Sequence, residues 1–122
     1  MRKANNIDIH FLQEEAKKSE DKEAFTVLAR MPNCRVGVGA RLEPPEQPIF
    51  FVEIIVSLCG SHHVVNLDFL EKNLAVLKQL RGRGYLLACE EDGTVSCELA
   101  IPSENLTAEY EAATLIIERG GK

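Results

Sequence analysis

The most apolar run in the chain covers residues 48–59, PIFFVEIIVSLC. It is rich in β-branched and aromatic residues, which favour strands. Because the side chains of a strand point alternately to its two faces, the run divides into two sets. The first set is entirely apolar and contains Phe50, Val52, Ile54, Val56 and Leu58. The second set is apolar around one charge and contains Ile49, Phe51, Glu53, Ile55 and Ser57. The run is therefore predicted to be the central strand of a sheet, with the core on its first face.

A second strand is predicted just before this one, over residues 35–42. Its apolar residues alternate and form one face, which contains Val36, Val38, Ala40 and Leu42. The other face carries Gly37 and Gly39, which leave room for a neighbouring group to approach closely. No helix follows these glycines, as a dinucleotide-binding loop would require. Instead the proline-rich residues 43–48 are typical of a turn, so the two strands are predicted to form a hairpin.

A second hairpin is predicted around Glu91-Asp92-Gly93, since Asp-Gly between two strand patterns is typical of a hairpin turn. The apolar face of its second strand contains Val95, Cys97, Leu99 and Ile101. A three-residue loop would place Tyr85, Leu87 and Cys89 on this face, whereas a two-residue loop would place Leu86, Ala88 and Glu90 there. Burying Glu90 without a partner is costly, so we favour the longer loop.

Helices are predicted in three further regions. Asp8 can cap a first helix, and the polar run over residues 13–23 is typical of a solvated helix surface. Apolar spacing then resumes at residues 24–28, so either one bent helix or two short helices are expected before Met31. Asn66 can cap a helix that reaches about Arg81. Ser103 can cap the last helix.

The predicted element order is therefore α-β-β-α-β-β-α. We expect an α+β fold, a two-layer sandwich in which helices pack on a mainly antiparallel, four-stranded sheet of two hairpins. The 122 residues fit a single domain over 1–122. This order of elements resembles that of dimeric chaperone-like folds, such as bacterial secretion chaperones and the YbjN-like proteins, and more loosely the roadblock fold. The resemblance implies an interaction module that works as a dimer.

The composition of the chain limits the classes of partner and the location that we expect. The net charge of −5 argues against broad binding to a phosphate backbone, so no nucleic-acid partner is expected. Apolar runs are too short to span a membrane, and no signal-peptide core follows the basic residues 1–6. A cytoplasmic location without membrane contact is expected. The four cysteines, Cys34, Cys59, Cys89 and Cys97, are then expected to be reduced and structural.

Candidate chemistry is confined to the loop Cys59-Gly60-Ser61-His62-His63. A Cys-x-x-His pair can bind zinc, but a structural site needs four ligands, and only Cys34 is available as a third. We favour a plain loop with a buried free cysteine, and we predict no metal, cofactor or catalytic residue. The alternative functions are a metal- or thiol-dependent protein that uses Cys59, His62 and His63, or a small enzyme with an unrecognised pocket.

The second face of the central strand suggests a function. Its residues Ile49, Phe51 and Ile55 would form an apolar patch, and exposed patches of this kind commonly mark interfaces. We therefore expect a dimeric adaptor or chaperone-like module that self-associates through this face and has room for another protein partner. Alternatively, a helix of the same chain covers the patch. Glu53 needs water or a partner, for which Arg35 or Arg41 on the neighbouring strand is available.

Overall fold

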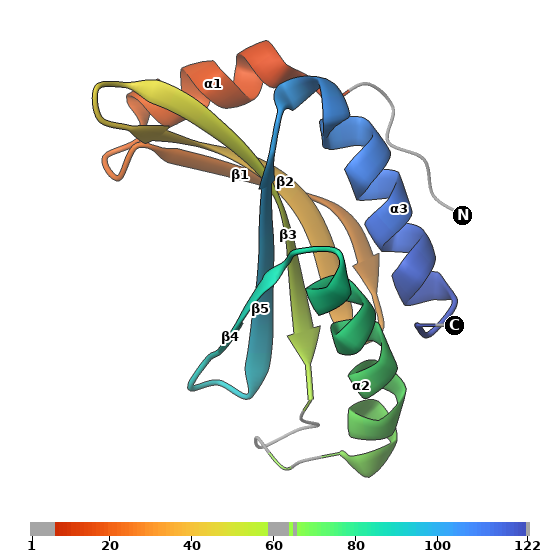
Figure 1. Cartoon of the computed structure of the whole chain (residues 1–122). Coiled ribbons are helices and arrows are strands. Elements are labelled where there is room, and N and C mark those ends of the chain that lie inside the picture. Colours follow the sequence, from red (N-terminus) through yellow and green to blue (C-terminus); the bar gives the residue numbers. More distant parts are fainter. Residues whose placement is uncertain (1–6, 59–63, 65, 122) are drawn as a thin grey trace.

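The computed structural model describes residues 7–58, 64 and 66–121 (Figure 1). In this part of the chain, three α-helices accompany one antiparallel sheet with the strand order β1-β2-β3-β5-β4. The elements are α1 (Ile9–Lys18), β1 (Glu23–Met31), β2 (Cys34–Glu43), β3 (Gln47–Ser57), α2 (Leu67–Gly82), β4 (Leu86–Cys89), β5 (Thr94–Ile101), the 3-10 turn η2 (Ser103–Asn105) and α3 (Leu106–Glu118). The predicted α+β class and antiparallel sheet are confirmed.

The prediction was wrong for residues 23–31, which form strand β1 rather than a helix. The sheet consequently has five strands instead of four, and the element order is α-β-β-β-α-β-β-α. The reason lies at Leu28, where the register with β2 shifts between Val27 and Ala29. A bulge of this kind adds one residue and breaks the two-residue alternation by which a strand is recognised.

Helix α1 starts at its predicted cap, but it ends before the polar run over residues 13–23, which was predicted to be helix surface, is complete. The Asp8 carboxylate accepts a hydrogen bond of 2.9 Å from the backbone N–H of Phe11, which is a normal N-terminal cap. The helix ends at Lys18. Lys22, with φ of 59°, then leads the chain into β1.

The core lies between the helices and one face of the sheet (Figure 1). The central strand β3 pairs with β2 and β5, and its Phe50, Val52, Ile54 and Val56 face is buried, as predicted. Leu12 from α1, Leu80 from α2 and Tyr110 from α3 belong to the same apolar cluster. The helices therefore cover one face, and no helix of the described residues covers the other face of the sheet.

In the β4–β5 hairpin, the side chains lie on the faces of the sheet that the sequence predicts. Leu87 lies opposite Cys97 and Cys89 opposite Val95, and Gly93 adopts the left-handed conformation with φ of 84°. Cys89 and Cys97 are thus diagonal neighbours rather than a directly opposed pair. Glu90 is exposed, which agrees with the argument that its burial would be costly.

None of the helices described is both long and apolar enough to cross a membrane.

Candidate functional site

The face of the sheet without helices, called here the open face, carries the predicted interface residues Ile49, Phe51 and Ile55. Phe51 is nevertheless 0% exposed. The ring of Phe25 on β1 is nearly parallel to the Phe51 ring, with 6.3 Å between centroids and 4° between planes. The guanidinium carbon of Arg41 lies 5.0 Å from the centroid of the same ring. Neighbouring side chains of this face therefore bury Phe51 inside the monomer.

The two glycines of β2 make this arrangement possible. A Cβ atom at Gly37 would lie 2.5 Å from Cζ of Phe25, and one at Gly39 would lie 2.8 Å from Cε2 of Phe51 and closer still to Cζ of that ring. Both distances are too short for carbon atoms in contact, so each ring rests on backbone that carries no side chain. The predicted role of the glycines, to admit a neighbouring group, is confirmed.

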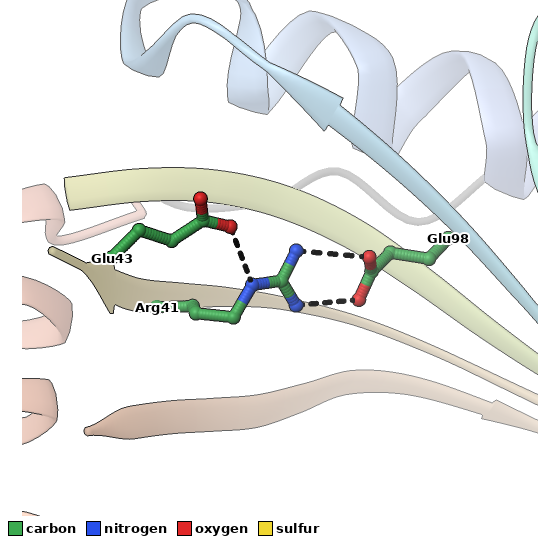
Figure 2. A network of polar contacts seen from close by, with 3 residues as sticks. All are labelled: Arg41, Glu43 and Glu98. Carbon is green, nitrogen blue, oxygen red and sulfur yellow. Dashed lines mark hydrogen bonds and ion pairs between the residues drawn. The ribbon is translucent and has the colours of Figure 1, made fainter. Parts of the chain in front are cut away.

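Arg41 is held in place by carboxylates from two strands (Figure 2). Its two terminal nitrogens donate to the two carboxylate oxygens of Glu98 on β5, each at 3.1 Å, and its Nε lies 3.6 Å from Glu43. This bidentate geometry is the strong form of an arginine–carboxylate pair. The hydrogen bonds to Glu98 raise the pKa of Arg41. The pair spans β3 and fixes the guanidinium above Phe51.

Glu53 lies directly opposite Glu98 on the open face. Burial is the largest cause that raises the pKa of Glu53, and the negative charges of Glu98 and Glu23 raise it further. The positive charge of Arg35 lowers this pKa. Of the two arginines considered as partners for Glu53, Arg35 is the one that stabilises its charge. The open face thus has a polar network over its aromatic residues, and it is less apolar than the sequence suggested.

A second surface is more exposed and more apolar. It consists of Leu67 and Leu74 on α2 and of Leu86 and Leu87 on β4, and it is called here the α2–β4 surface. The exposed fractions are 69% for Leu67, 44% for Leu74, 77% for Leu86 and 37% for Leu87. The register with β5 places Leu86 on the open face beside Glu98 and Leu87 on the helix-covered face beside Cys97.

Helix geometry places the two α2 leucines away from the side of α2 that faces α3. Gly121, at the end of α3, accepts a hydrogen bond of 2.8 Å from Gln79, which identifies the side of α2 that faces α3. With about 100° of rotation per residue, Leu67 and Leu74 lie on the opposite side. Figure 1 shows α2 with α3 on one side and β4 on the other.

The two edges of the sheet differ in how they are protected. Strand β1 has a bulge at Leu28, carries Glu23 and Arg30, and packs beside α1. Bulges, charges and a covering element are the usual means by which proteins block pairing at an edge. Strand β4 consists of Leu86-Leu87-Ala88-Cys89, which contains no charge and no proline. Within the described part of the chain, the only protection of the β4 edge against pairing is the short length of the strand.

The start of β4 is fixed to the body of the protein. Glu109 on α3 accepts a hydrogen bond of 2.9 Å from the Tyr85 hydroxyl and two from Arg83, at 3.0 and 2.5 Å. Tyr85 is buried, and burial beside the Glu109 charge raises its pKa. From the sequence, this region is predicted only to contain the end of a helix near Arg81 and the start of a strand at Tyr85. The contact with α3 gives the edge strand a defined position.

The predicted metal candidates Cys59, His62 and His63 lie outside the described residues. Cys34, considered as a third ligand, is buried, and burial raises the pKa of its thiol to about 12. Such a thiol stays protonated at neutral pH. Within the described ranges, no group of three or more His, Cys, Asp or Glu side chains is arranged to hold a metal ion.

Comparison with known proteins adds no relative: no family model, curated protein or solved structure matches the chain.

Proposed function

We propose that the protein is a homodimeric protein-interaction module, of the adaptor or chaperone-like kind, and that its two copies associate through the α2–β4 surface. The observation that carries this proposal is Leu86, a leucine with 77% of its surface exposed on an unpaired, uncharged edge strand. A cytoplasmic location fits the free thiols of Cys34 and Cys97.

The chemistry of β4 favours a second copy as the occupant. An edge strand offers unpaired backbone N–H and C=O groups, which another strand can bind. A two-fold axis beside β4 would pair the strand with itself in antiparallel orientation, and a closed two-fold dimer is the commonest form of oligomer. The partner strand would meet no like charge, because β4 has none.

The leucines supply the apolar part of the interface. Leu86 and Leu87 project from opposite faces of the strand, so a partner that lies beside β4 covers both. Complete burial of a leucine is worth about 1.5–3 kcal/mol. Because about three quarters of Leu86 is still exposed, its burial in both copies would contribute roughly 2–5 kcal/mol. Leu67 and Leu74 would add to this from α2.

The open face is the other surface on which the copies can meet, and it was the one expected from sequence. Ile49 and Ile55 are half-buried there, and Phe51 is covered by Phe25 and Arg41. Apart from Leu86, the most exposed large hydrophobic residue of this face is Phe25, at 39%, whereas Leu67 and Leu86 of the α2–β4 surface are 69% and 77% exposed. We therefore rank this face second, and the experiment distinguishes the two.

Sedimentation velocity over a micromolar concentration series tests the proposal. The wild-type chain should sediment with twice its mass of 13.6 kDa. Leu86→Lys should shift the protein to monomer, because in each copy it replaces an apolar contact by a charge that the interface would have to bury. Ile55→Lys is the matched control on the open face and should remain dimeric. Circular dichroism would show that both variants are folded.

Three results would contradict the proposal. A wild-type protein that is monomeric throughout the series would remove self-association altogether. Dissociation by Ile55→Lys with a dimeric Leu86→Lys would move the interface to the open face. Equal dissociation by both variants would show that the effect is not confined to β4.

A further inference from the structure

A separate feature of the molecule lies at the turn between β1 and β2. A hollow of about 330 Å³ opens there, lined by Arg30, Asn33 and Arg35 and by the hydroxyl residues Ser57 and Thr94 of β3 and β5. None of the described residues that line it is a carboxylate. In a chain with 19 acidic and 14 basic residues, this is a local concentration of positive charge.

The two arginines face each other across the hairpin. Arg30 and Arg35 are directly opposed in the register of β1 and β2, and like charges in this position destabilise a sheet. Arg35 is near the charge of Glu53. The side chain of Arg30 makes no hydrogen bond or ion pair with any described residue. The repulsion between the two guanidinium groups is therefore only partly compensated within the protein.

Asn33 adds an unused donor to the same hollow. Its side-chain nitrogen Nδ2 is buried and has no hydrogen-bond partner. A buried donor without an acceptor is costly and calls for an explanation in each case. The terminal torsion of asparagine rotates between two broad wells, so the amide that lines the hollow can turn toward a ligand there.

We propose that this hollow binds a phosphate group, with Arg30 and Arg35 as its charged ligands and the Asn33 amide as a neutral donor. Guanidinium groups bind phosphate through paired N–H donors. A dianion between the two arginines would replace their repulsion by attraction. The volume is at the lower end of small-ligand sites, so the fitting ligand is a single phosphate group with at most a small organic part.

The surroundings limit the charge of the ligand. A neighbouring hollow shares Arg35 and Thr94 but is acidic, with Glu53, Glu90 and Asp92 among its lining residues. A ligand with several phosphate groups would extend into this negative region. A monophosphate held on the Arg30 side avoids it. Phosphate binding does not depend on self-association, because no residue of the α2–β4 surface takes part.

NMR titration at constant ionic strength tests the site, with inorganic phosphate and phosphoserine as probes. Saturable shifts are expected for the Asn33 side-chain amide and for the Nε–H groups of Arg30 and Arg35. Arg30→Gln and Arg35→Gln should each weaken binding at least about tenfold, as expected from the loss of one charged hydrogen-bonded pair. Arg30→Lys should also weaken it, because a lysine cannot form the paired contact.

Arg81→Gln is the matched control, since it removes the same charge from an exposed position at the end of α2. Retained affinity in this variant supports a specific site, and an equal loss would reduce the effect to net charge and overturn the proposal. Absence of saturation at millimolar phosphate would overturn it as well. Tighter binding of phosphoserine than of inorganic phosphate would assign the site to phosphorylated compounds, and the reverse order would assign it to the free ion.

Discussion

Gly39→Ala is expected to destabilise the protein, because the aromatic cover of the open face rests directly on the backbone of β2. A Cβ atom at Gly39 would lie 2.6 Å from the carbonyl oxygen of Ala24 on β1 and 2.8 Å from Cε2 of Phe51, and it would lie closer still to Cζ of that ring. The ring has no free space to enter, since it is fully buried between Phe25 and Arg41. The new methyl group must therefore push apart two strands or displace the ring.

The size of the effect follows from these contacts. Overpacking by a methyl group typically costs about 1–3 kcal/mol, and contact with a backbone oxygen favours the upper half of this range. Displacement of the ring would also weaken its contact with Arg41, worth about 0.5–1 kcal/mol at an exposed site. Alanine regains about 0.5–1 kcal/mol by restricting the unfolded chain. The net loss should be about 2 kcal/mol, or roughly 8 °C in Tm for a domain of this size.

Urea unfolding followed by circular dichroism measures this loss. Gly82→Ala at the end of α2 is the matched control, since its Cβ would meet no atom within 4 Å. The control should be neutral or slightly stabilising, because alanine favours a helix more than glycine does. If Gly39→Ala were as stable as the wild type, the rings would be free to move. The apolar side chains of the open face would then be available to a partner, contrary to our argument.

Two further predictions concern titratable groups. Cys89 is exposed, whereas burial raises the pKa of both Cys34 and Cys97 to about 12. Brief alkylation of the folded protein should therefore modify Cys89 alone of these three. Equal labelling of Cys34, measured by peptide mapping, would contradict the buried core. Since the pKa of Glu53 is raised, its ionisation costs stability as pH rises above the unfolded value of about 4.3. Glu53→Gln should thus raise the urea midpoint at pH 7 and lose this advantage toward pH 4, whereas an equal gain at both pH values would contradict the argument.

Much of the fold could be predicted because burial leaves a regular pattern in the sequence. The β3 run has the composition of a central strand, and it lies between β2 and β5. The register of the β4–β5 hairpin followed from one energetic argument, the cost of burying Glu90, which is indeed exposed. Local chemistry also sufficed at Asp8, where a short acidic side chain caps α1.

Strand β1 could not be predicted for an equally physical reason. An edge strand is only half covered, so its composition is mixed, and the bulge at Leu28 removes its alternation. What remains over residues 24–28 has the spacing of a short amphipathic helix. Pairing with β2 decides the conformation, and that pairing is a tertiary interaction that the local sequence does not contain.

This one error also affected the predicted interface. Phe25, Gly39 and Phe51 occupy one row across three strands, because Phe25 pairs with Gly39 and Gly39 with Phe51. With residues 23–31 taken as a helix, no neighbouring strand was expected to place a second ring beside Phe51, and the open face appeared more apolar than it is. The assignment of β1 as a strand places a second ring beside Phe51 and explains why the facing positions on β2 are glycines.

The same sheet order makes the opposite edge the one in need of a partner. From sequence, Leu87 was placed on the apolar face of the hairpin and Leu86 on the other face, and both would be more buried if another strand lay beyond β4. The chain ends its sheet at β4 instead, so Leu86 faces solvent next to unpaired backbone groups. The protein blocks β1 with a bulge, charges and α1, but gives β4 an uncharged sequence and a fixed attachment through Tyr85 and Glu109. Because this edge is both apolar and held in position, we propose a second copy of the same strand as its partner.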